Sequence, residues 1–302
     1  MTQFDKQILE SLWKWKFLTT AAIAELHFPA LSAAYAHRRL LHLKKARLIQ
    51  WLHIDGDGNG KSFAWSLSLN GFEAIRSTLP DLKESGYKSE SPEHDLLVGA
   101  IHLGEWIYGL PEGCEFCTEQ ELRRLHLGQL QDWVPKTTIR RTDGYWLTQF
   151  DGEPGVVALE VETSRKSPSE YREIAQFYDN RPELFRVVWL VKKDSIAHAV
   201  NAAIQEGKPG KRLHNFIRAT DFYDQGWGAV FFLGRDVGKP LARLLLPAST
   251  TSKRHVASTL ILNTLKSPHR SAKYDSIRAI AKSQRLGISL VSPNASSLPT
   301  TL

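Results

Sequence analysis

The sequence contains few sulfur-bearing residues and no long apolar run. Its 302 residues include two cysteines and one methionine, and two cysteines are too few for a disulfide framework. No run of about 18 apolar residues is present, and the first residues enter an amphipathic pattern instead of a signal peptide. These absences predict a cytoplasmic protein with no membrane span. A hydrophobic content of 42% is still sufficient for a buried core, in two domains.

Positive charge is concentrated toward the end of the chain. The formal net charge is +7, and residues 239–302 contain ten Lys and Arg against a single acidic residue. The preceding 238 residues therefore hold 29 basic residues against 31 acidic ones. We predict that residues 238–302 form a basic, weakly ordered tail that contacts nucleic acid electrostatically. A tail that only improves solubility is the alternative.

Residues 1–80 follow the order of a winged helix-turn-helix domain. Helical periodicity covers residues 5–15, 21–27 and 32–45, and strands at 48–54 and 62–69 flank a glycine-rich turn. The last of these helices has basic and aromatic residues on one face, as docking in the major groove of double-stranded DNA requires. A winged helix that binds protein is the alternative. The predicted DNA-contacting residues are Ser32, Tyr35, Arg38, Arg39, His42, Lys45 and, in the turn, Lys61.

The glycine-rich turn at residues 55–61 partly matches two ligand-binding motifs. The segment from Gly56 to Ser62 is one residue short of a phosphate-binding P-loop and precedes a strand. The same turn matches the start of an EF-hand loop, but Ser66 replaces the glutamate required at the twelfth position. We therefore interpret the segment as a plain turn.

Residues 91–237 predict an α/β sandwich around a mixed sheet. The expected helices are 92–108, 168–179 and 195–206, and the expected strands are 114–118, 137–147, 155–162, 185–191 and 229–233. Cys114 and Cys117 lack a second pair at zinc spacing and are interpreted as core residues. Tyr171 and Tyr178 are spaced as a packing stripe on the second helix, with Tyr171 as a nucleophile the alternative.

Three carboxylates lie near the ends of two adjacent expected strands. Side chains alternate along a strand, so Glu160 and Glu162 should share one face. With Asp143 from the preceding strand, they predict an all-oxygen site for Mg²⁺ or Mn²⁺. The alternative is a polar strand end paired with Arg141 or Arg165.

The order of elements, with "Thr-Asp-Gly" at 142–144 and "Ala-Leu-Glu-Val-Glu-Thr-Ser-Arg-Lys-Ser" at 158–167, resembles the PD-(D/E)xK (restriction-endonuclease-like) nuclease superfamily. Adding the winged helix, "Glu-His-Asp" at 93–95 and "Thr-Glu-Gln-Glu-Leu-Arg" at 118–123, residues 5–235 look like the replication-relaxation family. That family includes MobC-type plasmid mobilisation relaxases.

The resemblance implies roles for particular residues. Asp143 matches the metal-binding aspartate of the superfamily and Glu160 its second acidic residue. Glu162 stands where the usual lysine would be, and Lys166 is the candidate to replace that lysine. The resemblance also assigns a catalytic role to two residues outside this motif, His94 and Glu119.

The function implied is that of a metal-dependent DNA nickase or relaxase. It would act at an origin-like site of a plasmid or mobile element, with a mobilisation accessory or coupling protein as a further partner. A divalent cation would assist phosphodiester cleavage. One alternative is a catalytically inactive DNA-binding regulator of replication or transcription, which the glutamate at position 162 favours. Another is a defence-type restriction nuclease.

Overall fold

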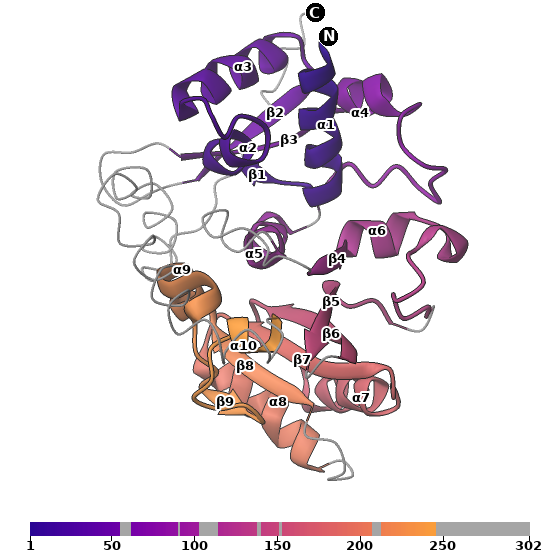
Figure 1. Ribbon diagram of the computed structural model, residues 1–302, viewed down its shortest axis with the longest axis vertical. Coiled ribbons are helices and arrows are strands. Elements are labelled where there is room, and N and C mark those ends of the chain that lie inside the picture. The colour runs from indigo at the N-terminus through magenta and orange to yellow at the C-terminus, as the bar shows by residue number, and fades with distance from the viewer. Residues whose placement is uncertain are drawn as a thin grey trace, which may run out of the picture.

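The structure is a computed structural model, and it describes residues 1–54, 62–89, 91–102, 114–137, 140–150, 153–206 and 213–245. The predicted turn with Lys61 lies outside the described residues, as does most of the predicted tail (238–302), from residue 246 onward. The first residues of that tail, 238–245, are described, and Leu241 and Leu244 among them are buried. The described chain is a mixed α/β protein (Figure 1). We call residues 1–75 the N-terminal region and residues 92–245 the sheet region.

The N-terminal region contains four helices and a small antiparallel sheet in the order β1-β3-β2. Threonine or serine side chains cap α1, α2, α3 and α4 by accepting a backbone N–H bond of the first turn. The helices and strands predicted here from periodicity are confirmed within a few residues. The elements are α1 (Gln3–Trp15), β1 (Leu18–Thr19), α2 (Thr20–His27), α3 (Ala33–Lys45), β2 (Ile49–Ile54), β3 (Ser62–Leu67) and α4 (Leu69–Ile75).

The sheet region is built on six strands in the order β4-β5-β6-β7-β8-β9. The pairs β6–β7 and β7–β8 are parallel and the others are antiparallel. The strands are β4 (Glu115–Thr118), β5 (Gly144–Phe150), β6 (Glu153–Glu162), β7 (Leu184–Val191), β8 (His214–Arg218) and β9 (Leu233–Gly234). The helices are α5 (Pro92–His102), α6 (Glu119–Arg124), α7 (Pro168–Asp179), α8 (Asp194–Glu206), α9 (Ala219–Gln225) and α10 (Ala242–Leu245), with short 3₁₀ turns at Leu127–Gln129 and Gly226–Gly228.

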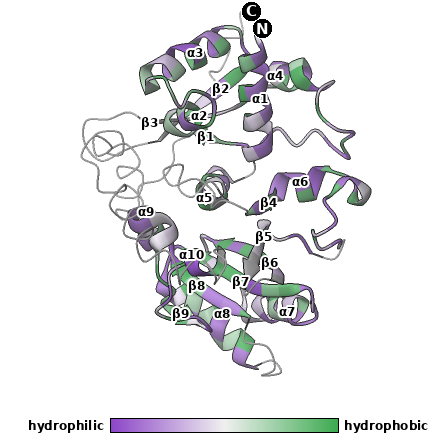
Figure 2. Ribbon diagram, in the orientation of Figure 1, coloured by the Kyte–Doolittle hydropathy of each residue, from purple (hydrophilic) through white to green (hydrophobic). Residues whose placement is uncertain are grey.

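The hydropathy of the elements matches their positions. Strands β6 and β7 are predominantly hydrophobic, whereas α6 is mostly hydrophilic (Figure 2). Parallel strands with both faces covered by helices require such apolar runs. Among the described residues, no helix combines the length and the apolar character needed to cross a bilayer.

One predicted strand begins later than expected, and the difference changes the site. The strand predicted at 137–147 starts at Gly144 and continues to Phe150. Before Gly144, side chains take part in the bonding to β6: the Thr142 hydroxyl donates to the Leu159 carbonyl, which also accepts from the Asp143 amide, and the Asp143 carboxylate accepts from the Val161 amide at 2.7 Å. Asp143 therefore precedes its strand instead of lying within it.

Other differences are confined to short elements. Helix α6 was not predicted, although Thr118 and Glu121 form the capping box that marks a helix start. Strand β8 was not predicted either, and the last strand lies at 233–234 instead of 229–233.

The two regions meet at the C-terminal end of α1. The rings of Trp15 and Phe116, one from each region, lie 5.3 Å apart. The Trp13 indole also donates at 2.9 Å to the carbonyl of Ser85, which lies in the segment between the two regions. Buried apolar residues of both regions belong to one continuous core. The end of α1 is therefore part of the packing of the sheet region.

Candidate metal centre

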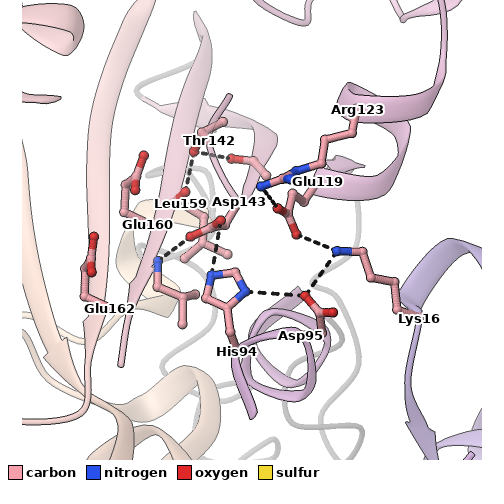
Figure 3. Close-up of polar contacts among 12 residues, drawn as sticks. Lys16, His94, Asp95, Glu119, Arg123, Thr142, Asp143, Leu159, Glu160 and Glu162 are labelled. Atoms are coloured by element: carbon pink, nitrogen blue, oxygen red, sulfur yellow. Dashed lines mark hydrogen bonds and ion pairs between the residues drawn. The ribbon is translucent and has the colours of Figure 1, made fainter. Parts of the chain in front are cut away.

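Three side chains from separate elements come together where the two regions meet. His94 lies in the first turn of α5, Glu119 begins α6, and Asp143 directly precedes β5. One ligand atom of each lies within 4.8 Å of the others. Two ligands of a small divalent ion, each about 2.1 Å from it, lie about 3–4 Å apart. The ligand atoms of the His94–Glu119–Asp143 group, drawn in Figure 3, are therefore at most slightly farther apart than they would be around a bound ion.

Asp143 is oriented by the backbone of β6. Its Oδ2 accepts from the Val161 amide at 2.7 Å, and its own amide donates to the Leu159 carbonyl at 3.0 Å. Its Oδ1 lies 3.3 Å from His94 Nε2. Burial alone would raise the pKa of Asp143, but the neighbouring His94 and the Val161 amide outweigh burial and hold that pKa below its usual value.

His94 lies between two carboxylates. Its Nε2 faces Asp143, and its Nδ1 lies 3.4 Å from Asp95 Oδ1. Burial disfavours the charged imidazole, but the Asp143 carboxylate and the hydrogen bonds to Asp143 and Asp95 raise the pKa of His94 to about 11. A carboxylate on the second ring nitrogen is the usual way in which proteins orient a histidine ligand toward a metal.

Glu119 is held by two cations. Its Oε1 lies 2.5 Å from Arg123 Nη2, one helical turn further along α6, and its Oε2 lies 3.2 Å from Lys16 Nζ. The side chain is buried. Burial, followed by the Asp143 carboxylate, raises the pKa of Glu119, although Lys16 and Arg123 oppose this.

Glu160 and Glu162 do not join this group. They share one side of β6, as strand alternation predicts, and point away from Asp143 and His94 (Figure 3). Glu160 accepts a hydrogen bond from the Tyr178 hydroxyl and pairs with Arg140 at 3.2 Å. The predicted metal trio of Asp143, Glu160 and Glu162 is thus corrected, because Asp143 Oδ2 accepts from the Val161 amide and Asp143 Oδ1 faces His94 of α5.

Lys166, the candidate replacement for the missing lysine, is also on the far side of β6. Its ammonium forms an ion pair with Glu162, and its backbone amide donates to the Tyr171 hydroxyl at 3.0 Å. Tyr171 and Tyr178 are completely buried, which confirms their interpretation as packing residues. Cys117 is buried and Cys114 half-buried, and both thiols are free.

The predicted DNA-contacting face of α3 is largely exposed. Tyr35, Arg38, His42 and Lys45 are all accessible, and Ser32 caps the helix by accepting from the Tyr35 amide. These residues therefore form one accessible, basic and aromatic helix face.

Arg39 is the exception on α3. Its guanidinium binds the Asp5 carboxylate of α1 at 2.5 and 2.6 Å and the Thr2 hydroxyl at 3.1 Å. The predicted contact of Arg39 with DNA would have to compete with this ion pair. This arginine joins α3 to α1.

Three charged neighbours of the group were not predicted from the sequence, namely Asp95, Lys16 and Arg123. Asp95 follows His94 in "Glu-His-Asp" and Arg123 follows Glu119 at helical spacing, so both were within reach of pattern analysis. Lys16 comes from the other region, and no local pattern indicates its contact.

Comparisons of the chain with protein-family models, with curated proteins and with solved structures find no match. What this group does is therefore inferred from its geometry and its chemistry.

Proposed function

We propose that the protein is a metal-dependent DNA endonuclease that nicks an origin-like site of a plasmid or mobile element. In this proposal, the N-terminal region is a winged helix-turn-helix and the sheet region has a PD-(D/E)xK nuclease-like fold. The observation that carries the proposal is the convergence of His94, Glu119 and Asp143 within 4.8 Å. The element order around that group supports it.

The donor set suits a divalent transition ion better than Mg²⁺. Carboxylate oxygens suit both Mg²⁺ and Mn²⁺, whereas an imidazole nitrogen is a ligand that Mg²⁺ seldom takes. His94 would bind through Nε2 as the neutral imidazole, while Asp95 faces Nδ1. We therefore expect Mn²⁺ to bind more tightly than Mg²⁺.

The residues of the group have separate tasks in this proposal. A bound divalent ion would supply Lewis-acid chemistry for phosphodiester cleavage. Asp143, anchored by the Val161 amide, presents one oxygen in a fixed direction. Arg123 and Lys16 hold the Glu119 carboxylate from both sides and keep positive charge close to the place where a phosphate would lie.

The exposed face of α3 supplies DNA affinity in this proposal. Arg38 and Lys45 provide positive charge for phosphates, and Tyr35 and His42 lie on the same helix face. This face is separate from the metal group, so substitutions can affect DNA binding and metal binding independently.

The proposal is tested by titrating the protein with Mn²⁺ in a calorimeter and by incubating it with supercoiled plasmid. We expect wild-type protein to bind about one Mn²⁺ and to convert plasmid that carries its cognate site to open circles. Asp143→Asn should abolish both, with a loss of nicking on the order of 10²–10³-fold. Glu162→Gln is the matched control, because it removes a buried carboxylate on the opposite side of β6.

Two results would contradict this assignment. Nicking that survives in Asp143→Asn would exclude the group as the catalytic site. Loss of Mn²⁺ binding in Glu162→Gln with retention in Asp143→Asn would move the site to the far side of β6.

A second candidate function is that of a DNA-binding regulator without catalysis. One observation favours it: the carboxylates of the group are already paired with cations of the chain, Glu119 with Lys16 and Arg123, and Asp143 with His94. Absence of Mn²⁺ binding even with DNA present, together with intact DNA binding through α3, would select this function.

A further inference from the structure

Lys16 reaches the metal group from the other region of the molecule. It follows α1 as the C-cap residue, and its ammonium lies 3.1 Å from Asp95 Oδ1 and 3.2 Å from Glu119 Oε2. These partners are 79 and 103 residues away in the sequence. Figure 3 shows the Lys16 side chain entering from a ribbon separate from those that carry the other labelled residues.

The position of Lys16 is costly in two ways. Its φ of 60° places a non-glycine residue in the left-handed region. Its side chain is only 10% exposed, and a lysine is rarely buried unless it is paired. A residue that keeps an unfavourable backbone and an unfavourable burial needs compensation, which its two carboxylate partners provide.

Lys14 offers a direct comparison within the same helix end. It also joins the two regions, since its ammonium lies 3.0 Å from Glu121 Oε1 and 4.8 Å from the centre of the Phe116 ring. Its side chain is 32% exposed, and Glu121 is not part of the metal group. Lys14 thus joins the two regions while remaining partly exposed, so this task alone does not explain why Lys16 is buried beside Glu119.

The charges around the group show what Lys16 adds. Three carboxylates (Asp95, Glu119 and Asp143) face two cations (Lys16 and Arg123). His94 loses its proton when it binds a metal, so we count it as neutral in the charge of the metal-binding state. The sum is one negative charge. A divalent ion brings it to one positive charge, and a single phosphodiester brings it to zero. Without Lys16, the divalent ion alone would already neutralise the group.

We infer that Lys16 biases the group toward holding a divalent ion together with a phosphodiester, because its charge weakens the binding of the ion alone and strengthens the binding of the phosphodiester. This inference rests on the proposed function. Lys16 keeps the loaded group positive, so the metal binds weakly alone and more tightly when a phosphate neutralises the excess charge. By linkage, the metal increases the affinity for the phosphate by the same factor. Lys16 is thus a positioning residue that acts through Glu119 and through the charge of the site.

The experiment measures Mn²⁺ affinity from the signal of free Mn²⁺ in electron paramagnetic resonance, with and without a thymidine oligonucleotide. In the wild type, the oligonucleotide should tighten Mn²⁺ binding by about tenfold, the size of a typical coupling between two sites. Lys16→Gln keeps a hydrogen-bond donor but removes the charge. It should bind Mn²⁺ alone about tenfold more tightly and the oligonucleotide about tenfold more weakly, while the coupling between the two ligands persists because it is their own mutual attraction. Lys16→Arg should behave as the wild type.

Lys14→Gln is the matched control and should leave both affinities and the coupling unchanged. If Lys16→Gln and Lys14→Gln bind Mn²⁺ alike, the inference is wrong although the proposed function stands. If the wild type binds Mn²⁺ without any coupling to the oligonucleotide, the inference is wrong whether or not the variants fold. If the wild type binds no Mn²⁺, the proposed function fails together with the inference.

Discussion

On one side of β6, Asp143 lies between a histidine and a backbone amide, whereas on the other side Glu160 lies against a tyrosine hydroxyl and Arg140. Both carboxyl groups are buried, yet the pKa of Asp143 is lowered and that of Glu160 is raised to about 7 by burial and by the Asp143 carboxylate. The groups that surround a buried carboxyl group therefore decide whether it is charged. Within the described part of the chain, only the first side brings together an imidazole and carboxylates that can share a metal ion.

The largest effect should come from removing the buried cation on the first side. Lys16→Met leaves Asp95 and Glu119 buried without their shared lysine, and breaking such a buried pair costs about 3–5 kcal/mol. Lys166→Met removes the cation beside Glu162 on the second side. Glu162 is buried, but the Lys166 side chain is 35% exposed, so solvent screens this pair and we expect a clearly smaller loss than for Lys16→Met. Urea unfolding measures both, and equal losses would contradict the comparison.

A smaller loss should follow when Glu160 loses its hydroxyl donor. Tyr178→Phe preserves the ring packing of a completely buried residue but leaves a carboxyl oxygen short of a partner. We expect the free energy of unfolding to fall by about 1–3 kcal/mol. Tyr171→Phe is the control, since its hydroxyl accepts from the Lys166 amide, whereas the Tyr178 hydroxyl donates to the Glu160 carboxylate. A greater loss in Tyr171→Phe would show that the contact with Glu160 contributes little.

The raised pKa of Glu160 predicts a pH dependence of stability. A carboxyl group whose pKa is higher in the folded state stabilises the fold fully below pH 4.5, and this contribution is lost as the pH rises through about 7. Glu160→Gln imitates the protonated form at every pH. Its stability relative to the wild type should therefore increase between pH 4.5 and about 7, as measured by urea unfolding across that range. If the stability of Glu160→Gln relative to the wild type stays constant or decreases over this range, the ionised Glu160 carboxylate stabilises the fold instead.

The smallest effect concerns two neighbouring arginines of α3. Arg38 is exposed, whereas Arg39 binds Asp5. Arg38→Ala should weaken the binding of duplex DNA and reduce the salt dependence of the affinity by about one charge. Arg39→Ala should leave DNA affinity largely unchanged and cost about 1 kcal/mol of stability, because its pair is only partly exposed. If Arg39→Ala weakened DNA binding and Arg38→Ala did not, Arg39 would be the residue that contacts DNA.

The sequence was sufficient for much of the fold and for part of the site. Apolar periodicity located the main helices and strands, and strand alternation correctly placed Glu160 and Glu162 on one side of β6. Strand alternation could not place Asp143, because its position depends on where β5 begins, and there the Thr142 and Asp143 side chains supply part of the bonding to β6. The contact of Lys16 depends on a left-handed residue at the end of α1. Such a conformation leaves no periodic signal, so only the folded chain shows that the N-terminal region reaches the group.

The contacts between the two regions at the end of α1 have a geometric consequence for any DNA bound to this protein. Trp13, Trp15, Lys14 and Lys16 all contact residues beyond position 80, and Arg39 fastens α3 to the same helix. If α3 reads the duplex and the metal group cuts it, the two events are separated by a constant number of base pairs. The cleavage position would then lie at a fixed distance from the recognised sequence, and it would move with that sequence when the sequence is moved along a plasmid.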